Sequence, residues 1–465
     1  MHLARELLRL LLETIACFLF YFRINILVLK TAGPLMYSKI AIVLLVLFLG
    51  SFDFLSAETW PTWRGPNGNG FTPETKTPVT WDRENNIAWK VKLTSPGNSS
   101  PVVFGQQLYL TQADNNGRTR SLICFATDTG TQKWIHSETV EELEPTHPTN
   151  PYCAASPVTD GKYVIAMLGS GGLVCCDADG KLLWKKNFGA PQHLFGQGAS
   201  PIIWEDLCII NYGPGKEQFF AGLKLSDGSL LWRIDIPISN APNPFDQPDG
   251  PKLPEGSTLR DPFGTWATAM IRKVEGQPDE LLLSLPEKII AVNPRSGKEI
   301  WFCAGNGPQV ISSPLIGGDC VGSLGSFAFV VKPKGEGDQI ANRLWSDDND
   351  RPRIGTGLIY KKQMITTTMQ GVLECLSLET GDRLWHRRLS SGESGGATWS
   401  SLVQAGSKIY ALDQSGTTTV FMVEPEFLQI GQNRLDEPTN STPAISDGRI
   451  YIRTDQHLWC ISEPK

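Results

Sequence analysis

Short runs of alternating apolar and polar residues, each ending in a turn, follow one another along most of this chain. Between Leu373 and Leu378, apolar residues recur at the strand period of two. Residues 379–382, Glu-Thr-Gly-Asp, then supply a turn, because glycine adopts a positive φ without steric cost. A second strand begins at Arg383, so the local element is a pair of antiparallel strands.

A tryptophan marks the strand that follows each of these turns. The seven members of the series are Trp89, Trp134, Trp184, Trp232, Trp301, Trp345 and Trp385. In five of them a glycine stands four residues earlier. A period of about 40–50 residues with a turn at a fixed phase is typical of a propeller or another repeat array. A tryptophan at one phase of every repeat is expected to pack between units, so none of the seven is assigned to a binding site.

A second signature, Ser-Pro followed by a hairpin, precedes the pairs of strands in several repeats, and it drifts in the later copies. Proline at the start of a strand costs no ladder hydrogen bond. Each repeat is therefore predicted to contain an inner strand after the Ser-Pro position, two middle strands and an outer strand that carries the tryptophan. The eight inner-strand positions are Ser100, Ser156, Ser200, Thr265, Ser313, Gly355, Thr398 and Ser441.

The two ends of the repeat array are incomplete and complement each other. The outer strand at 87–93 precedes any inner strand, whereas the last unit, 442–462, has no outer strand after it. Residues 426–431 are taken as an outer strand that has lost its tryptophan. We therefore predict an all-β, eight-bladed propeller of four-stranded antiparallel blades over residues 87–465. Residues 87–93 complete the last blade and protect its edge.

The repeated pattern [Ala/Asp]-x-x-[Thr/Asp]-Gly-x-x-x-Trp with Ser-Pro inner strands resembles the pyrroloquinoline-quinone-type (PQQ-like) β-propeller superfamily over residues 87–462. That superfamily includes quinoprotein alcohol dehydrogenases, the propeller lipoprotein of the outer-membrane β-barrel assembly machinery, and secreted bacterial propellers of unknown role. The segment Trp-Pro-Thr-Trp-Arg-Gly-Pro-Asn-Gly-Asn-Gly is similar to the N-terminal signature of the third group. We interpret residues 58–86 as a strap over the ring, held by Trp60 and Trp63.

Four cysteines share one phase of the repeat, on the third strand of their units. They are Cys124, Cys175, Cys375 and Cys460. A residue type that recurs at equivalent positions is expected to be a small, buried packing group. Equivalent positions on different blades also lie too far apart to form a disulfide. The pattern therefore predicts four buried free thiols.

The adjacent pair Cys175-Cys176 has a second interpretation. Quinoprotein alcohol dehydrogenases carry a disulfide between adjacent cysteines that stacks on the quinone, and they bind Ca²⁺ beside it. Here both residues fall inside a strand, where neighbouring side chains point to opposite faces. Calcium needs several oxygen ligands, and no such set can be assigned in this sequence. We predict no cofactor, metal or catalytic residue, and keep a PQQ- and Ca²⁺-dependent alcohol or sugar dehydrogenase as the alternative.

Residues 1–57 are predicted to be a leader. Lys39 precedes an apolar run at 40–50, and Ala57 is a small residue at the position of a signal-peptide cleavage site. We interpret Met36 as the true start, with residues 1–35 an over-called extension. No cysteine follows the apolar run, so no lipid anchor is predicted. If the leader stays uncleaved, residues 40–55 form a marginal membrane anchor.

The net charge of the chain bears on which kinds of partner it can bind. The formal net charge is −6, and the leader contributes five basic and three acidic residues, which leaves −8 on the rest of the chain. Without a basic patch, nucleic acid is not expected to bind. We predict an exported monomer of the periplasm, the cell envelope or the medium.

Long connections between an outer strand and the next inner strand are predicted to open over the central funnel. One of them contains a 28-residue insertion at 239–266. We predict a scaffold that binds an envelope protein or a small polar ligand on this face. The candidate residues are His147, Asn150, Tyr152, His193, Gln197, Arg260, Asp261, Trp266, Arg353, Glu393 and Trp399.

Overall fold

The computed structural model of the chain describes residues 59–193, 195–215, 217–236, 264–325, 327–349, 351–389, 396–424 and 426–463. The predicted leader, Arg260, Asp261 and Glu393 lie outside these residues. The chain divides into residues 1–56 and 57–465, and every described residue belongs to the second unit. The described residues form strands, turns and three short 3-10 helices. None of these helices has the length and apolar composition needed to cross a membrane.

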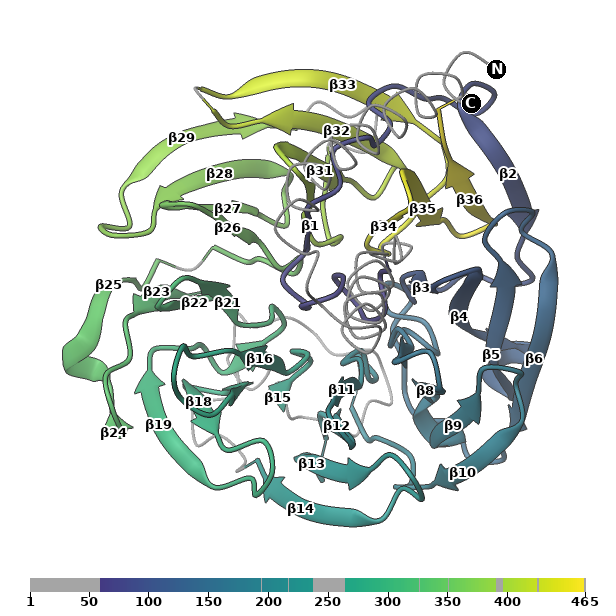
Figure 1. Cartoon of the computed structure of the whole chain (residues 1–465), viewed down its shortest axis with the longest axis horizontal. Coiled ribbons are helices and arrows are strands. Elements are labelled where there is room, and N and C mark those ends of the chain that lie inside the picture. Colours follow the sequence, from purple (N-terminus) through teal and green to yellow (C-terminus); the bar gives the residue numbers. More distant parts are fainter. Residues whose placement is uncertain are drawn as a thin grey trace, which may run out of the picture. The chain divides into compact units, whose positions relative to one another are not determined.

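Eight four-stranded antiparallel sheets surround a central axis, which confirms the predicted eight-bladed propeller (Figure 1). In each of the first seven blades the chain runs from an inner strand at the axis to an outer strand at the rim. The strands of the first four blades are β3 (Val102–Phe104), β4 (Gln107–Asp114), β5 (Thr119–Ala126) and β6 (Gln132–Thr139); β7 (Val158–Thr159), β8 (Tyr163–Met167), β9 (Leu173–Asp177) and β10 (Leu182–Lys186); β11 (Ile202–Trp204), β12 (Leu207–Tyr212), β13 (Phe219–Lys224) and β14 (Leu230–Asp235); and β16 (Met270–Arg272), β17 (Glu280–Leu285), β18 (Lys288–Val292) and β19 (Glu299–Ala304).

Blades 5 to 8 repeat this order, and a short strand, β24 (Gly337–Asp338), adds to the outer edge of blade 4. The strands of these four blades are β21 (Leu315–Gly317), β22 (Cys320–Leu324), β23 (Ala328–Val331) and β25 (Arg343–Asp347); β26 (Leu358–Tyr360), β27 (Gln363–Thr367), β28 (Val372–Ser377) and β29 (Arg383–Arg388); β30 (Val403–Ala405), β31 (Lys408–Leu412), β32 (Thr417–Met422) and β33 (Leu428–Arg434); and β34 (Ala444–Ser446), β35 (Arg449–Arg453), β36 (His457–Ile461) and β2 (Ile87–Lys92).

The ring closes through β2, the outer strand of blade 8. It pairs antiparallel with β36, with Ile87 opposite Ile461 and Lys92 opposite His457. The predicted closure, in which the strand at 87–93 completes the last blade, is confirmed. The edge of β36 is thereby covered within the same chain.

Each of five series tryptophans packs on the turn glycine of the next blade. Trp134 lies against Gly180, where a Cβ atom would come within 2.5 Å of the indole. The indole Nε1 of Trp134 also donates to the carbonyl oxygen of Ala178 at 2.9 Å. The glycine therefore serves twice, since it adopts a positive φ and leaves room for the neighbouring blade. The other four pairs are Trp89–Gly130, Trp184–Gly228, Trp232–Gly297 and Trp345–Gly381.

A small residue lies opposite the tryptophan on the third strand of several blades. In blade 3 this residue is Gly222, where a Cβ atom would lie 2.4 Å from the indole of Trp232. In four blades it is a cysteine that is free and fully buried, which confirms the prediction for these thiols. The four register pairs are Cys124–Trp134, Cys175–Trp184, Cys375–Trp385 and Cys460–Trp89.

A closed ring of eight hydrogen bonds joins the inner strands, and we name it the hydroxyl girdle. In each blade the backbone N–H of one Ser or Thr donates to the hydroxyl oxygen of its equivalent in the next blade, at 2.8–3.1 Å. The last member donates back to the first, so the ring has no end. Its members are Ser100, Ser156, Ser200, Thr268, Ser313, Thr356, Ser401 and Thr442.

The girdle corrects the predicted phase of four inner strands. Its members in these blades are Thr268, Thr356, Ser401 and Thr442, where the sequence pattern pointed to Thr265, Gly355, Thr398 and Ser441. In three of the four no proline follows the girdle residue, so nothing in the sequence fixed the position. Thr265 belongs instead to β15 (Gly264–Thr265), which pairs in parallel with β20 (Gln309–Val310).

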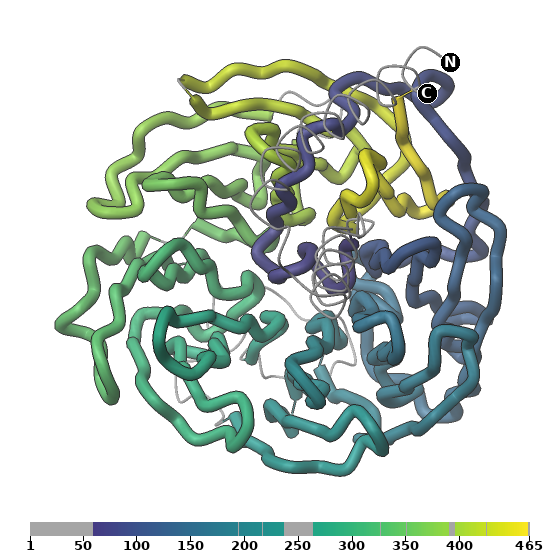
Figure 2. The backbone as a smooth tube through the Cα atoms, in the orientation of Figure 1, coloured from purple at the N-terminus to yellow at the C-terminus, as the bar shows by residue number. Residues whose placement is uncertain are grey.

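Residues 59–86 cross the middle of the ring before they reach β2 at its rim (Figure 2). Trp60 is buried and exchanges two backbone hydrogen bonds with Val103, and β1 (Phe71–Thr72) adds in parallel to β30. Both contacts come after the girdle residue of the inner strand. The segment therefore lies on the side of the girdle away from the outer-to-inner connections.

Candidate functional site

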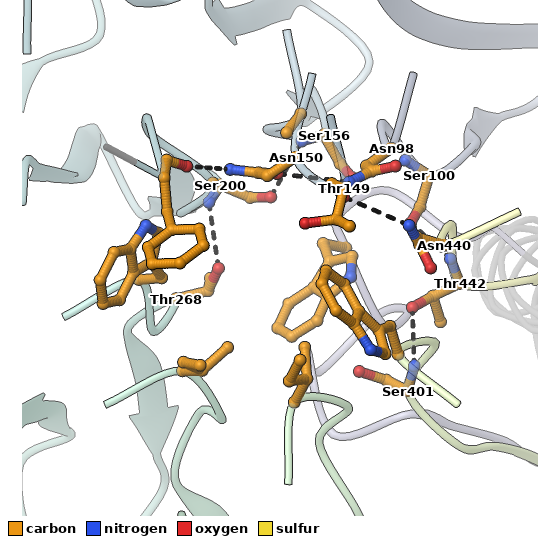
Figure 3. A pocket seen from close by; sticks show the side chains of 18 of the residues that line it. Asn98, Ser100, Thr149, Asn150, Ser156, Ser200, Thr268, Ser401, Asn440 and Thr442 are labelled. Carbon is orange, nitrogen blue, oxygen red and sulfur yellow. Dashed lines mark hydrogen bonds between the residues drawn. The ribbon is translucent and has the colours of Figure 1, made fainter. Parts of the chain in front are cut away.

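An axial cavity of about 340 Å³ lies inside the propeller, and side chains from every outer-to-inner connection line it. Trp63 of the strap contributes to the wall as well. The connections therefore gather around one opening, as the repeat phase predicts. Figure 3 shows girdle hydroxyls and three asparagines around this space.

Two layers of residues, each with one position per blade, build most of the wall. Six girdle residues line the cavity, and their hydroxyl hydrogens can be donated to a bound molecule. The second layer is the residue two positions before each girdle residue, because alternate residues of an extended chain point to the same side. All eight of these residues line the cavity, and we name them the octad. They are Asn98, Ala154, Gly198, Trp266, Ile311, Ile354, Trp399 and Asn440.

The octad divides the wall into a polar and an apolar side. Asn98 and Asn440 precede the inner strands of blades 1 and 8, which are neighbours in the ring. Blades 4 to 7 supply indole rings and isoleucine side chains instead. None of the described lining residues carries a formal charge. The cavity can therefore hydrogen-bond on one side and pack apolar surface on the other, without offering an acid or a base.

Asparagine side chains hold the connection between blades 1 and 2 against the polar side. The amides of Asn98 and Asn440 donate to the carbonyl oxygen of Thr149 at 2.9 and 3.2 Å. Asn150 donates in turn to the carbonyl oxygen of Phe195 at 2.6 Å. These bonds join four connections, and they preorganise the rim of the cavity (Figure 3).

Three of the eleven predicted site residues line the cavity: Asn150, Trp266 and Trp399. Trp266 is fixed by a hydrogen bond from its Nε1 to the carbonyl oxygen of Gly196 at 2.9 Å. The imidazole of His193 is buried and packs edge-on against Trp266, with ring centroids 4.9 Å apart. His193 therefore supports the wall from behind.

His147 is a second supporting residue. Its imidazole packs on the ring of Phe195, with centroids 5.1 Å apart, and Phe195 lines the cavity. The Nδ1 atom of His147 also bonds to the hydroxyl of Thr149 at 2.7 Å. The ring is thus held between two residues of the wall.

Three further candidates make contacts within the protein and do not line the axial cavity. Gln197 donates to the carbonyl oxygen of Asn211 at 3.2 Å. The ring of Tyr152 covers the guanidinium of Arg120 at 4.0 Å. Arg353 forms a buried ion pair with Glu374 at 3.1 Å. The remaining candidates, Arg260, Asp261 and Glu393, lie outside the described residues.

Sequence reasoning missed Trp63, Asn98, Thr149 and Asn440, as well as the girdle hydroxyls. The signal for the asparagines was present, because Asn98 stands two residues before the Ser-Pro of blade 1. The same phase in every other repeat marks the rest of the octad. Thr149 belongs to a long connection with no repeat phase, so no local pattern marks it.

The described cavity does not fit a quinone held by Ca²⁺. The quinone is a polycarboxylate, and the lining has neither a cation to meet its carboxylates nor a carboxylate to hold the metal ion. Among the described residues, no group of three or more His, Cys, Asp or Glu side chains could hold a metal ion. Cys175 and Cys176 lie within β9 and enter different core clusters, with Cys208 and Cys124 respectively.

Solved structures of similar fold include a BamB, a methanol dehydrogenase and a quinohemoprotein alcohol dehydrogenase. BamB from Moraxella catarrhalis gives a TM-score of 0.54 at 12% identity, over 81% of this chain and 99% of that chain. A europium-containing methanol dehydrogenase gives 0.60 at 11% identity, over 85% and 89%. The quinohemoprotein alcohol dehydrogenase from Comamonas testosteroni gives 0.57 at 12% identity, over 90% and 82%. At these identities the likeness shows the fold alone.

The sequence matches a family over nearly all of the propeller. That family is described as outer membrane protein assembly factor BamB, and the matched residues are 65–214 and 216–464. No curated protein sequence matches the chain closely enough to count as a relative. The match begins inside the strap and ends after β36, so it includes every blade. The PQQ-like resemblance is confirmed, and the chain belongs to the BamB family of propellers.

Proposed function

We propose that this protein is an exported, envelope-associated propeller that binds a partner protein through its axial cavity. The octad carries the proposal, because eight blades each direct one uncharged residue into a single preorganised space. The family description as an outer membrane protein assembly factor supports a partner from the cell envelope. The sequence pattern of residues 1–57 supports export.

The uncharged wall of the axial cavity favours, as the bound segment, the tip of a neutral loop from the partner protein. A volume of about 340 Å³ lies at the lower end of small-molecule pockets, which span about 300–1,000 Å³. An inserted loop can place an apolar side chain against Trp266 and Trp399, and its backbone can bond to Asn98 and the girdle hydroxyls. A charged segment would lose its hydration without gaining a counter-ion.

Site-specific photo-crosslinking in intact cells tests the proposal. We expect a photoreactive residue at Trp399 to give one discrete adduct with an envelope protein, and Asn98→Ala to reduce its yield severalfold. The matched control is the same photoreactive residue at Ser296, in the turn that precedes β19. A ladder of adducts shared by both positions, or no adduct at Trp399, would overturn the proposal.

An assay on the purified protein distinguishes a binding scaffold from a dehydrogenase. We expect no new absorption band after addition of PQQ and Ca²⁺, and no alcohol-dependent dye reduction. If dye reduction appears and depends on both additions, a quinone-dependent dehydrogenase replaces the proposal.

A further inference from the structure

Arg64, in the strap, is a buried cation without an acidic partner among the described residues. Its side chain is 0% exposed. Nη2 donates to the carbonyl oxygens of Asn69 and Gly357, whereas Nε and Nη1 have no hydrogen-bond partner in the described part of the chain. The ring of Trp63 lies 5.7 Å from the guanidinium carbon. Three of the five N–H donors of Arg64 therefore remain without an acceptor.

Three other buried arginines each have a glutamate as their acidic partner. Arg120 pairs with Glu144, Arg272 with Glu280, and Arg353 with Glu374. Arg453 has no such pair, but it lies in the field of Asp455 and Asp114. For Arg64 the only influence on the pKa is burial, which lowers it to about 9. A buried charge without an anionic partner is unfavourable, because the group has lost its hydration and gains no counter-ion in return.

A second cavity, of about 300 Å³, lies beside Arg64, between the strap and the inner strands of blades 5, 6 and 7. Most of its wall is apolar, and no acidic residue lines it in the described structure. The ammonium group of Lys361, which also lines the cavity, already pairs with Glu424. Arg64 is thus a cation without a counter-ion in the wall of a space large enough for a small molecule. The apolar part of the wall consists of Phe71, Pro314, Leu315, Ile316, Leu358 and Ile359.

We infer that this strap cavity binds a carboxylate carried on a small apolar group. The carboxylate accepts a charge-assisted hydrogen bond from an unpaired N–H donor of Arg64. The apolar group packs against Leu358 and Ile316. A peptide C-terminus that ends in an aliphatic residue and a free branched-chain acid share this chemistry. The site is separate from the axial cavity, because the two cavities have no described lining residue in common.

Calorimetric titration of the full chain tests the inference with three probes. They are acetyl-Gly-Leu with a free carboxylate, its C-terminal amide, and 3-methylbutanoate. We expect the free-acid peptide to bind at one site per chain, and the amide to bind at least tenfold more weakly. Binding of 3-methylbutanoate as well identifies a site for small acids, whereas binding of the peptide alone identifies a C-terminus site. If no carboxylate binds, Arg64 only anchors the strap and the inference is wrong.

Variants of the strap cavity test whether the carboxylate probes bind there. Arg64→Met keeps the length of the side chain and removes the charge, and we expect it to abolish binding. Arg83→Met is the matched control, because Arg83 is an exposed arginine of the same segment. Ile316→Trp narrows the cavity without changing Arg64, so it keeps the test decisive if Arg64→Met fails to fold. Unchanged binding in a folded Arg64→Met or Ile316→Trp variant would place the ligand elsewhere.

Discussion

At the scale of single residues, the contact between neighbouring blades depends on glycines, whose lack of a side chain leaves room for a tryptophan of the neighbouring blade. Gly180 has φ +87° and lies against the indole of Trp134, so any side chain there is both strained and in collision. Gly318 has φ +60°, but a Cβ atom at this position would have no other atom within 4 Å. The pair therefore separates the cost of backbone strain from the cost of packing.

We expect Gly180→Ala to lower the free energy of unfolding by about 2–5 kcal/mol. Backbone strain contributes about 1–2 kcal/mol and the collision about 1–3 kcal/mol. Gly318→Ala should lose only the first part. Urea unfolding of both variants measures the difference, and equal losses would show that the indole moves aside at no cost.

The buried thiols give a pH dependence with a defined sign. Burial raises the pKa of Cys124, Cys375 and Cys460 to about 12, whereas a thiol in the unfolded chain titrates near about 8.5. The unfolded chain therefore releases these protons first as the pH rises. The contribution to stability is complete below about pH 8.5 and is lost between that pH and about 12.

We expect the urea midpoint to be constant between pH 6 and 8 and to fall by pH 10. The double variant Cys124→Ala/Cys375→Ala should show a shallower fall. A thiol reagent at pH 8 should leave Cys124, Cys175, Cys375 and Cys460 unmodified until urea is added. Rapid labelling of any of the four in the native protein would contradict their burial.

At the scale of the element, each inner strand is tied to the next by one hydroxyl group. Ser156 accepts the N–H of Ser100 at 2.9 Å, and its own N–H donates to Ser200. We expect Ser156→Ala to destabilise the protein by about 1–3 kcal/mol, because it leaves a buried N–H without an acceptor. Ser156→Thr should stay close to the wild type, since threonine holds this position in three other blades.

Thermal and urea unfolding of the two variants check this prediction. Ser296→Ala, in an exposed turn, controls for loss of a hydroxyl that does not belong to the girdle. If Ser156→Ala unfolds like the wild type, a water molecule replaces the hydroxyl and the ring is not needed for stability.

The elements differ in how far the sequence predicts them. Tryptophan, glycine and cysteine positions could be predicted because each responds to a local constraint, either a turn or a tight contact. Ser-Pro marked the inner strands of blades 1, 2, 3 and 5, whereas the Ser-Thr-Pro of blade 8 was placed one residue early. Thr268 and Ser401 lack the proline, and there the predicted phase slipped by three residues. Asn150, Trp266 and Trp399 were found because they stand in connections that the repeat sends to one face.

The rest of the candidate site depends on contacts between distant segments. Asn440 reaches Thr149 across 291 positions of the chain. Trp63 enters the wall because the strap crosses the ring. The strap itself was predicted, but nothing in its own segment shows that this indole faces the cavity. Such neighbours follow from the closure of the ring, which the pattern of a single repeat does not contain.

At the scale of the whole molecule, stability depends on closure by β2. A chain that begins at residue 95 loses Trp89 and leaves the edge of β36 unpaired. We expect it to aggregate or to unfold at much lower urea concentrations, because loss of a buried tryptophan alone costs about 3–5 kcal/mol. Size-exclusion chromatography and urea unfolding, with a chain that begins at residue 59 as the control, measure the effect. Normal folding of the shorter chain would mean that the ring does not need its eighth outer strand.

The pairing of Ile87 with Ile461 also sets the order of events when the protein is made. Residue 87 leaves the ribosome long before its partner exists, so β2 must wait while seven other blades are synthesised. During that time Trp89 lacks Cys460, the residue that lies opposite it on β36. A chain threaded through a membrane from its N-terminus therefore cannot close early. The topology itself delays completion until β36 has arrived on the same side as β2.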